Sequence, residues 1–147
     1  MRIAFTTVGH PGVTRMHVAL IGAALTRDMS LITRLCAGHV VTVAQTAQAL
    51  ASTSVITAAD VLVLDAGHER HELGNLVRSI RKRDPTMTLL LVNGGLDQLD
   101  IAEAFQLGVT DYFARPWNER LLVERIEVLA ARRRAATMAA TSQGEQQ

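Results

Sequence analysis

Few residues in this chain have the types and spacing that chemistry requires. His68 and His71 lie in GHERHE, where two imidazoles could contact one metal ion, but the pattern is not HExxH and suggests no third ligand nearby. We interpret this stretch as a solvated loop and expect no metal site. No Ser/His/Asp or Cys/His arrangement stands out, and no glycine-rich phosphate-binding or dinucleotide-binding motif follows an apolar run. The sequence therefore does not indicate an enzyme.

Three short motifs place polar side chains close behind apolar runs. VLVLDAG ends an apolar run with Asp65, and LLLVNGG ends a later one with Asn93. The third motif, GVTDYFARPW, contains Tyr112, Arg115 and Pro116. A carboxylate in a partly buried cleft is costly unless it is paired. We therefore expect Arg115 to lie within hydrogen-bonding distance of Asp65.

The composition is that of one globular domain. The chain has 147 residues, of which 48% are hydrophobic and 20% charged, and this excludes a disordered chain. The 15 Lys and Arg nearly balance the 14 Asp and Glu, so no electrostatic argument favours direct contact with nucleic acid or a membrane. The single cysteine, Cys36, can form no internal disulfide, which favours a cytoplasmic location. We expect Cys36 to lie in the core.

Five apolar runs alternate with stretches of helical period. This alternation predicts an α/β fold in which helices cover both faces of a parallel sheet. The expected strands are His17–Gly22, Val40–Val43, Val61–Leu64, Thr88–Val92 and Asp111–Phe113.

The stretches between these runs repeat apolar residues at helical spacing. The first places Leu25, Met29, Ile32 and Cys36 on one face. The later stretches do the same with Leu73, Leu76, Val77 and Ile80, with Ile101, Ala104 and Phe105, and with Leu122, Ile126 and Leu129. Only Thr46–Ala58 has a weak stripe, because Ala, Ser and Thr dominate it. Asn118 is expected to cap the last helix.

The two ends of the chain fall outside this pattern. Residues 1–15 contain a further strand-like run, Ile3–Val8, which either pairs at a sheet edge or precedes a true start at Met16. Residues 135–147 lose the apolar period, which predicts a frayed helix end and then a flexible tail or linker. The expected domain spans residues 16–134.

In their order and spacing, the three motifs resemble those of the receiver domains of bacterial response regulators in two-component signalling. In that family, the aspartate at the position of Asp65 accepts a phosphoryl group from a histidine kinase. Asn93 stands where receivers carry Thr or Ser, and Tyr112 stands at the switch aromatic. Arg115 and Pro116 stand at the family's lysine and proline.

The resemblance covers residues 16–134 and implies a doubly wound, flavodoxin-like (βα)₅ sheet with strand order 2-1-3-4-5. In such a sheet, ligands bind beyond the carboxyl ends of the strands. The resemblance therefore implies that Asp65, Asn93 and Arg115 lie together at that end.

The carboxylates with which receivers bind Mg²⁺ are missing. Phosphoryl transfer depends on cations held around the transferred group, and Mg²⁺ prefers oxygen ligands. Receivers supply an acidic pair after the first strand, but here those positions hold Gly22 and Ala23, and the first acidic residue of the chain is Asp28. Arg115 is also a larger, planar cation than lysine. These departures indicate an atypical pseudo-receiver, with no Mg²⁺ or other cofactor expected.

Three functions fit this sequence. The preferred one is a non-catalytic bacterial signalling or localisation module that acts by protein–protein interaction. The resemblance implies the face formed by helix 4, strand 5 and helix 5, on which Asp97, Gln98, Tyr112 and Arg120 would contact a second copy or another protein. The alternatives are a response regulator phosphorylated at Asp65 in a phosphorelay, and the N-terminal pseudo-receiver domain of a larger regulator or ATPase.

Two basic clusters are interpreted as solvated helix surfaces. The first is near the end of the third expected helix and consists of Arg78, Arg81, Lys82 and Arg83. For this cluster, a partner site is the alternative. The second is Arg132–Arg134, near the end of the fifth helix.

Overall fold

The apolar runs of the sequence form strands, and the stretches between them form helices. The computed structural model describes residues 2–3, 15–46, 49, 53–65, 70–92, 98–114 and 116–145, some of them by their backbone alone. The elements in this part of the chain are β1 (Arg2–Ile3), β2 (His17–Ile21), α1 (Ala23–Thr26), α2 (Met29–Cys36), β3 (Val40–Ala44), α4 (Thr53–Thr57), β4 (Val61–Asp65), α5 (Arg70–Arg83), β5 (Leu89–Val92), α6 (Gln98–Leu107), β6 (Asp111–Phe113) and α7 (Glu119–Glu145).

The sheet has the strand order β1-β3-β2-β4-β5-β6. All pairings from β3 to β6 are parallel, so the five expected strands have the predicted order 2-1-3-4-5. β1 adds an antiparallel pair at the outer edge of β3, with Arg2 opposite Thr42 and Ile3 opposite Val41. Pairing at a sheet edge is therefore confirmed for Arg2 and Ile3. The rest of the run Ile3–Val8 lies outside the described residues.

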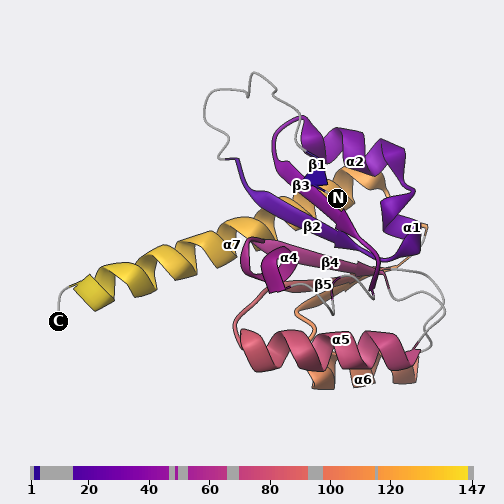
Figure 1. Ribbon diagram of the computed structural model, residues 1–147. Coiled ribbons are helices and arrows are strands. Elements are labelled where there is room, and N and C mark those ends of the chain that lie inside the picture. Colours follow the sequence, from indigo (N-terminus) through magenta and orange to yellow (C-terminus); the bar gives the residue numbers. More distant parts are fainter. Residues whose placement is uncertain are drawn as a thin grey trace.

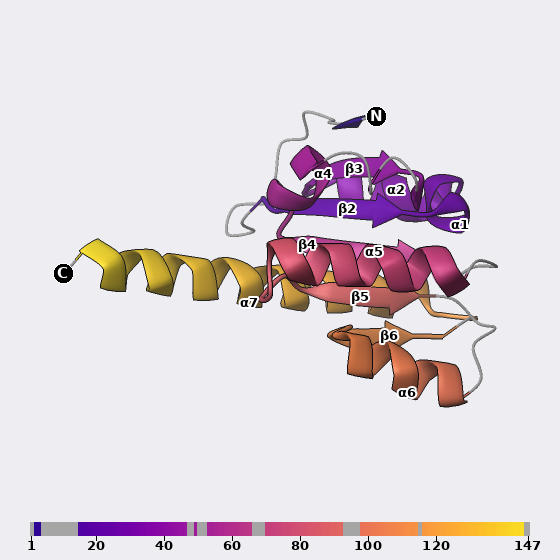
Figure 2. The same ribbon diagram turned by 60° about the horizontal axis from the view of Figure 1, so that its bottom comes forward.

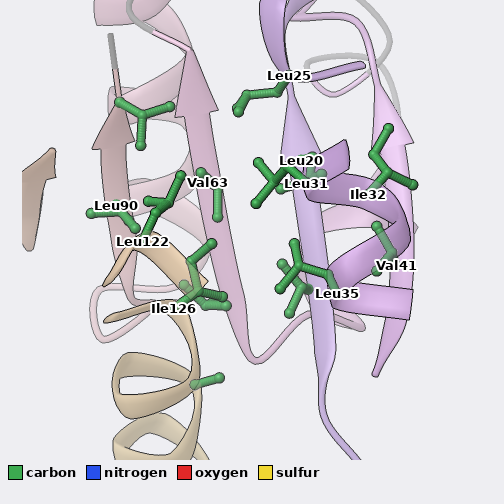
Figure 3. Close-up of a cluster of buried hydrophobic side chains, with 14 of the residues drawn as sticks. Leu20, Leu25, Leu31, Ile32, Leu35, Val41, Val63, Leu90, Leu122 and Ile126 are labelled. Carbon is green, nitrogen blue, oxygen red and sulfur yellow. The ribbon is translucent and has the colours of Figure 1, made fainter. Parts of the chain in front are cut away.

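Helices cover both faces of the sheet because each strand alternates its side chains between two cores. On β2, Val18 and Leu20 face one core, while Ala19 and Ile21 face the other. α1, α2 and α7 cover the first face, and Figure 3 shows their side chains interleaved with those of the strands. α4, α5 and α6 cover the second face (Figure 1). Cys36 is buried in the first core, as expected.

The first helical stretch is broken at Asp28. Its side chain accepts a hydrogen bond from the N–H of Leu31 (3.1 Å) and so caps α2, which separates α2 from the short α1. This break turns Met29 away from the core, and 62% of its surface is exposed. The expectation that Met29 shares the buried face of Leu25 and Ile32 was therefore wrong.

α6 ends, and α7 begins, at residues that favour these boundaries. Gly108 follows α6 with a φ of 112°, and the Asn118 side chain accepts a hydrogen bond from the N–H of Leu121 at the start of α7 (3.3 Å). Ala104 is buried, but Phe105, which was expected on the same face, is 44% exposed. α6 therefore has a narrower buried face than its sequence predicts.

α7 continues far beyond the domain. It runs to Glu145 and projects past the sheet (Figures 1 and 2), although a frayed end was expected from residue 135. Residues 135–141 are all exposed. A helix that is already nucleated on the sheet gains one backbone hydrogen bond for each added residue, and alanines favour this extension. No helix in the described part of the chain is long and apolar enough to cross a membrane.

Arg81 was wrongly assigned to a solvated surface. Its Nε donates to the carbonyl of Gly108 (2.9 Å), and its Nη1 donates to the carbonyls of Pro85 (3.1 Å) and Met87. Burial lowers the pKa of Arg81. The side chain therefore joins the end of α5 to the loops before β5 and β6. The other members of this cluster are exposed, as expected: Arg78, Lys82 and Arg83.

Candidate functional site

Asp65 lies at the carboxyl end of β4, next to the end of β2. The two strands are parallel, and Ile21 lies opposite Leu64, so Gly22 comes next to Asp65. The Asp65 Oδ2 accepts a hydrogen bond from the N–H of Ala24 (2.9 Å), the second residue of α1. The carboxylate thus binds the backbone of the turn that follows β2. Ala23, the other position that the resemblance implies for the acidic pair, is exposed at the start of α1.

Only glycine fits at position 22, because a side chain there would clash with Asp65. Its φ is 117°, a conformation that other residues rarely adopt. A Cβ atom added at Gly22 would lie 2.5 Å from the Cβ of Asp65, much closer than two such carbons approach. The N–H of Gly22 donates to the carbonyl of Ala44 at the end of β3 (2.9 Å), so the turn is held from that side too.

The described residues beside Asp65 do not fit a Mg²⁺ ion. Gly22 and Ala23 offer no side-chain ligand, and the described residues contain no group of three His, Cys, Asp or Glu that could hold a metal. Asp28, the first acidic residue after β2, is used as the cap of α2.

Several predicted site residues lie outside the described part of the chain. These are Asn93 and Arg115, and also His68 and Asp97. Nothing tests the expected contact between Arg115 and Asp65, which stays a prediction. His71 and Gln98 lie on α5 and α6, but only their backbones are described. Pro116 is exposed just before α7.

Tyr112 lies in the middle of β6, the last strand of the sheet, and pairs in register with Leu91 of β5. It is half-buried against the core under α4, α5 and α6. This burial raises the pKa of the Tyr112 hydroxyl. The side chain therefore packs at the β6 edge, on the face of the sheet that α6 covers.

Charged groups surround this edge. Asp111 of β6 forms an ion pair with Arg125 of α7 (3.2 Å), which joins the helix to the edge strand. Arg120 and Glu124 form an exposed pair one turn apart on α7 (3.3 Å). Phe105 of α6 adds an exposed aromatic ring. We call the surface of these three elements the α6–β6–α7 face.

A second polar network, which no motif in the sequence indicates, lies at the amino ends of the strands. Arg134 of α7 donates to the carboxylate of Asp60 (3.0 Å) and to the carbonyl of Arg15 (2.7 Å). Asp60 also accepts the N–H of His17 (2.8 Å). Arg133, next to Arg134, pairs with Asp84. The expectation that this arginine cluster is merely exposed was wrong for both residues.

A buried histidine belongs to the same network. His39 is 3% exposed, and its Nδ1 accepts the N–H of Met16 (3.2 Å). Its Nε2 must then carry the hydrogen, which it donates to Glu127 of α7 (3.0 Å). No local motif marks these residues, because their partners lie far away in the sequence.

Comparison with known proteins places this fold among receiver domains. The chain is similar to the receiver domain of the response regulator TorR, with 26% identity and a TM-score of 0.63 over 80% of this chain and 98% of that one. A CheY-like receiver domain from Methanospirillum hungatei JF-1 has a TM-score of 0.71 at 19% identity, over 84% and 99% of the two chains. The fold defined by the sheet and its helices is therefore the receiver fold.

Sequence comparison agrees over a shorter stretch. The regulatory protein VirG of Agrobacterium fabrum (strain C58) is 30% identical over 69 residues, which is 47% of this chain and 27% of VirG. This chain therefore matches about a quarter of VirG's length. No protein-family model matches the chain described in this structure. Fold and similarity together show that the chain resembles the receiver domains of two-component response regulators.

Proposed function

We propose that this chain is a cytoplasmic signalling or localisation module that acts by protein–protein interaction and not as an enzyme. In this proposal, Mg²⁺-dependent phosphorylation of Asp65 does not switch it. The observation that carries the proposal is the fit of Gly22 against Asp65, which leaves no room for a Cβ atom where a receiver carries a metal-binding carboxylate.

Asp65 then has a structural role. Its bond to the N–H of Ala24 fixes the turn between β2 and α1, and pairing with Arg115 would neutralise its charge. A carboxylate held in this way keeps the end of the sheet in one state without a phosphoryl group.

The α6–β6–α7 face is the proposed contact surface. It combines the half-buried Tyr112 with the exposed Phe105 and with the charges of Arg120 and Glu124. An aromatic centre with a charged rim is typical of protein interfaces. The proposed partner is a second copy of the chain or another protein, and its binding would be indifferent to Mg²⁺ and phosphodonor.

The test is to add beryllofluoride with Mg²⁺ and to follow amide chemical shifts, because this mimic of a phosphoryl group binds a competent receiver site. We expect no saturable shifts at Asp65, Asn93 or Tyr112. Shifts that converge on these three residues with rising beryllofluoride would overturn the proposal in favour of phosphorylation at Asp65.

That second function has one observation in its favour. Asp65 stands at the carboxyl end of β4, where a phosphoacceptor belongs in this fold, and its carboxylate is only half-buried. A third possibility is that the chain is the N-terminal part of a larger regulator or ATPase. The projecting end of α7 would then lead to a following domain.

A further inference from the structure

The residue just before β2 is held by a histidine ring. The N–H of Met16 donates to the Nδ1 atom of His39 (3.2 Å), and the carbonyl of Met16 accepts the N–H of Val40 (2.9 Å). The imidazole thus adds one hydrogen bond at the end of the ladder between β2 and β3. Met16 and His39 are both buried, so water does not readily replace this bond.

The same ring contacts α7. The Nε2 atom of His39 lies 3.0 Å from a carboxylate oxygen of Glu127, whose side chain is 36% exposed. A ring whose Nδ1 accepts a hydrogen bond is neutral and carries its hydrogen on Nε2. The bonds to Met16 and to Glu127 therefore both require this one neutral form of the ring.

A protonated ring cannot keep both bonds. An imidazolium carries a hydrogen on each nitrogen, so its Nδ1–H would face the N–H of Met16, and two donors cannot form a hydrogen bond. The contact with Glu127 would gain strength in the same step, because an imidazolium and a carboxylate form a charge-assisted pair. One proton would therefore exchange the bond to the start of β2 for a stronger bond to α7.

The residues on either side of Met16 are held by groups of a different kind. Arg134 donates to the carbonyl of Arg15 (2.7 Å), and Asp60 accepts the N–H of His17 (2.8 Å) and pairs with Arg134 (3.0 Å). Arg and Asp side chains ordinarily keep their charges between about pH 5 and about pH 8, whereas histidine ordinarily gains a proton within this range. Of these three attachments, the bond to Met16 is the one that mild acid would break.

Two further groups come from the elements beside His39. α2 contributes the carbonyl of Leu35, which accepts the backbone N–H of His39 (2.9 Å). β2 contributes the ring of His17, whose Nε2 lies 2.6 Å from the Oγ1 of Thr42 on β3. His17 is a second ring that could titrate next to Met16, so an experiment has to separate the two histidines.

We propose that His39 is a pH-sensitive switch between β2 and α7. The neutral ring holds the N–H of Met16, and the protonated ring releases it and binds Glu127 as an ion pair. Mild acid then loosens the segment that enters β2 and tightens α7 on the sheet. The switch lies at the amino ends of the strands, whereas Asp65 lies at the carboxyl end of β4. It therefore does not depend on the proposed function, and it gives the domain an input other than a phosphoryl group.

A pH titration of the whole chain, followed by nuclear magnetic resonance between about pH 8 and about pH 5, tests the switch. Nitrogen chemical shifts of the His39 ring report its protonation, and the exchange protection of the Met16 amide reports the hydrogen bond. We expect this protection to fall about tenfold as His39 gains its proton. The amide of Val40, which donates to the carbonyl of Met16, is the internal control and should change much less.

Three results would each overturn the switch. The first is a His39 ring that stays neutral down to about pH 5. The second is a ring that becomes protonated while the Met16 amide keeps its protection. The third is an equal loss of protection at Met16 and Val40, which would show a general loosening of the strand ends.

Matched variants assign the change to one ring. His17→Gln removes the neighbouring histidine and should leave the transition at Met16 unchanged, so its disappearance would overturn the assignment to His39. His39→Asn keeps an acceptor but cannot gain a proton, so protection of Met16 should no longer depend on pH. The titrations of the original chain and of His17→Gln decide the question even if His39→Asn does not fold.

Glu127→Gln tests the connection to α7. Glutamine keeps an acceptor for the Nε2–H of His39 but removes the negative charge that favours the protonated ring. The transition at Met16 should therefore move to lower pH in this variant. A transition at the same pH as in the original chain would overturn the proposed part of α7 in the switch.

Discussion

Gly22 and Asp65 lie so close together that a Cβ atom at Gly22 would be 2.5 Å from the Cβ of Asp65, which is an obstacle to any metal-binding carboxylate at position 22. The obstacle lies in the backbone, since Gly22 has a positive φ and approaches the Cβ of Asp65. An acidic residue cannot simply be restored at this position. At the residue scale, the proposed absence of Mg²⁺-dependent phosphorylation therefore rests on the conformation of the turn as well as on a missing side chain.

Gly22→Asp should destabilise the fold instead of creating a metal site. We expect the free energy of unfolding to fall by about 2–4 kcal/mol, from backbone strain and overpacking together. Urea unfolding measures this change, with the exposed Ala23→Asp as a control of the same charge that is expected to be nearly neutral. A Gly22→Asp protein as stable as the original would contradict the described contact.

Arg81→Ala should be the most damaging substitution in its basic cluster. It leaves the carbonyls of Gly108, Pro85 and Met87 without this donor, which should cost about 2–3 kcal/mol of unfolding free energy. The exposed neighbour Arg83→Ala serves as the control, with an expected change below about 0.5 kcal/mol. Equal losses for the two variants would show that Arg81 is not structural.

At the scale of elements, the strands could be predicted from the sequence, but one helix break and two long-range ion pairs could not. The strands and their order followed from apolar runs and the family motifs, because a buried parallel strand needs such a run. The break at Asp28 was missed because a capping aspartate resembles any polar residue within a helix. Arg133 and Arg134 were misread because their partners Asp84 and Asp60 are distant in sequence.

The ion pair between Asp84, in the loop between α5 and β5, and Arg133 of α7 should weaken in acid. Burial alone would raise the pKa of Asp84, but hydrogen bonds from Thr86 and the nearby Arg133 and Arg81 outweigh it, so that the pKa is lowered. A carboxyl group whose pKa is lowered by folding stabilises the fold at pH values above its ordinary pKa of 3.8. This contribution is lost as the pH falls below 3.8.

Unfolding free energies measured between neutral pH and pH 2 test this expectation. Asp84→Asn should be less stable than the original chain at neutral pH, and the difference should shrink as the pH falls below 3.8. A difference that stays constant over the whole range would rule out the carboxylate as its cause.

On the scale of the whole molecule, α7 divides into a half that supports the domain and a half that extends from it. The first half packs Leu122, Ile126 and Leu129 into the core, while residues 135–141 are all exposed. Arg133 and Arg134 join α7 to Asp84 and Asp60, and the helix continues beyond residue 134, where the sequence predicts the end of the domain.

Removing residues 135–147 should leave the domain folded. We expect its unfolding free energy to change by less than about 1 kcal/mol, because the residues described there bury little surface. Thermal unfolding of the shortened chain measures this change, and a collapse in stability would contradict this division of α7.

The short strand β1 makes the two borders of the sheet unlike. Its antiparallel pairing covers Val41 and Thr42 of β3, so a foreign strand approaching there meets backbone groups that are already bonded. At the other border, β6 is the last strand of the sheet and carries Tyr112. Strand addition, whether by a peptide or by an aggregating neighbour, is thus directed towards β6. Deleting the first residues of the chain should expose unpaired backbone groups at the β3 border and so raise the tendency to form fibrils.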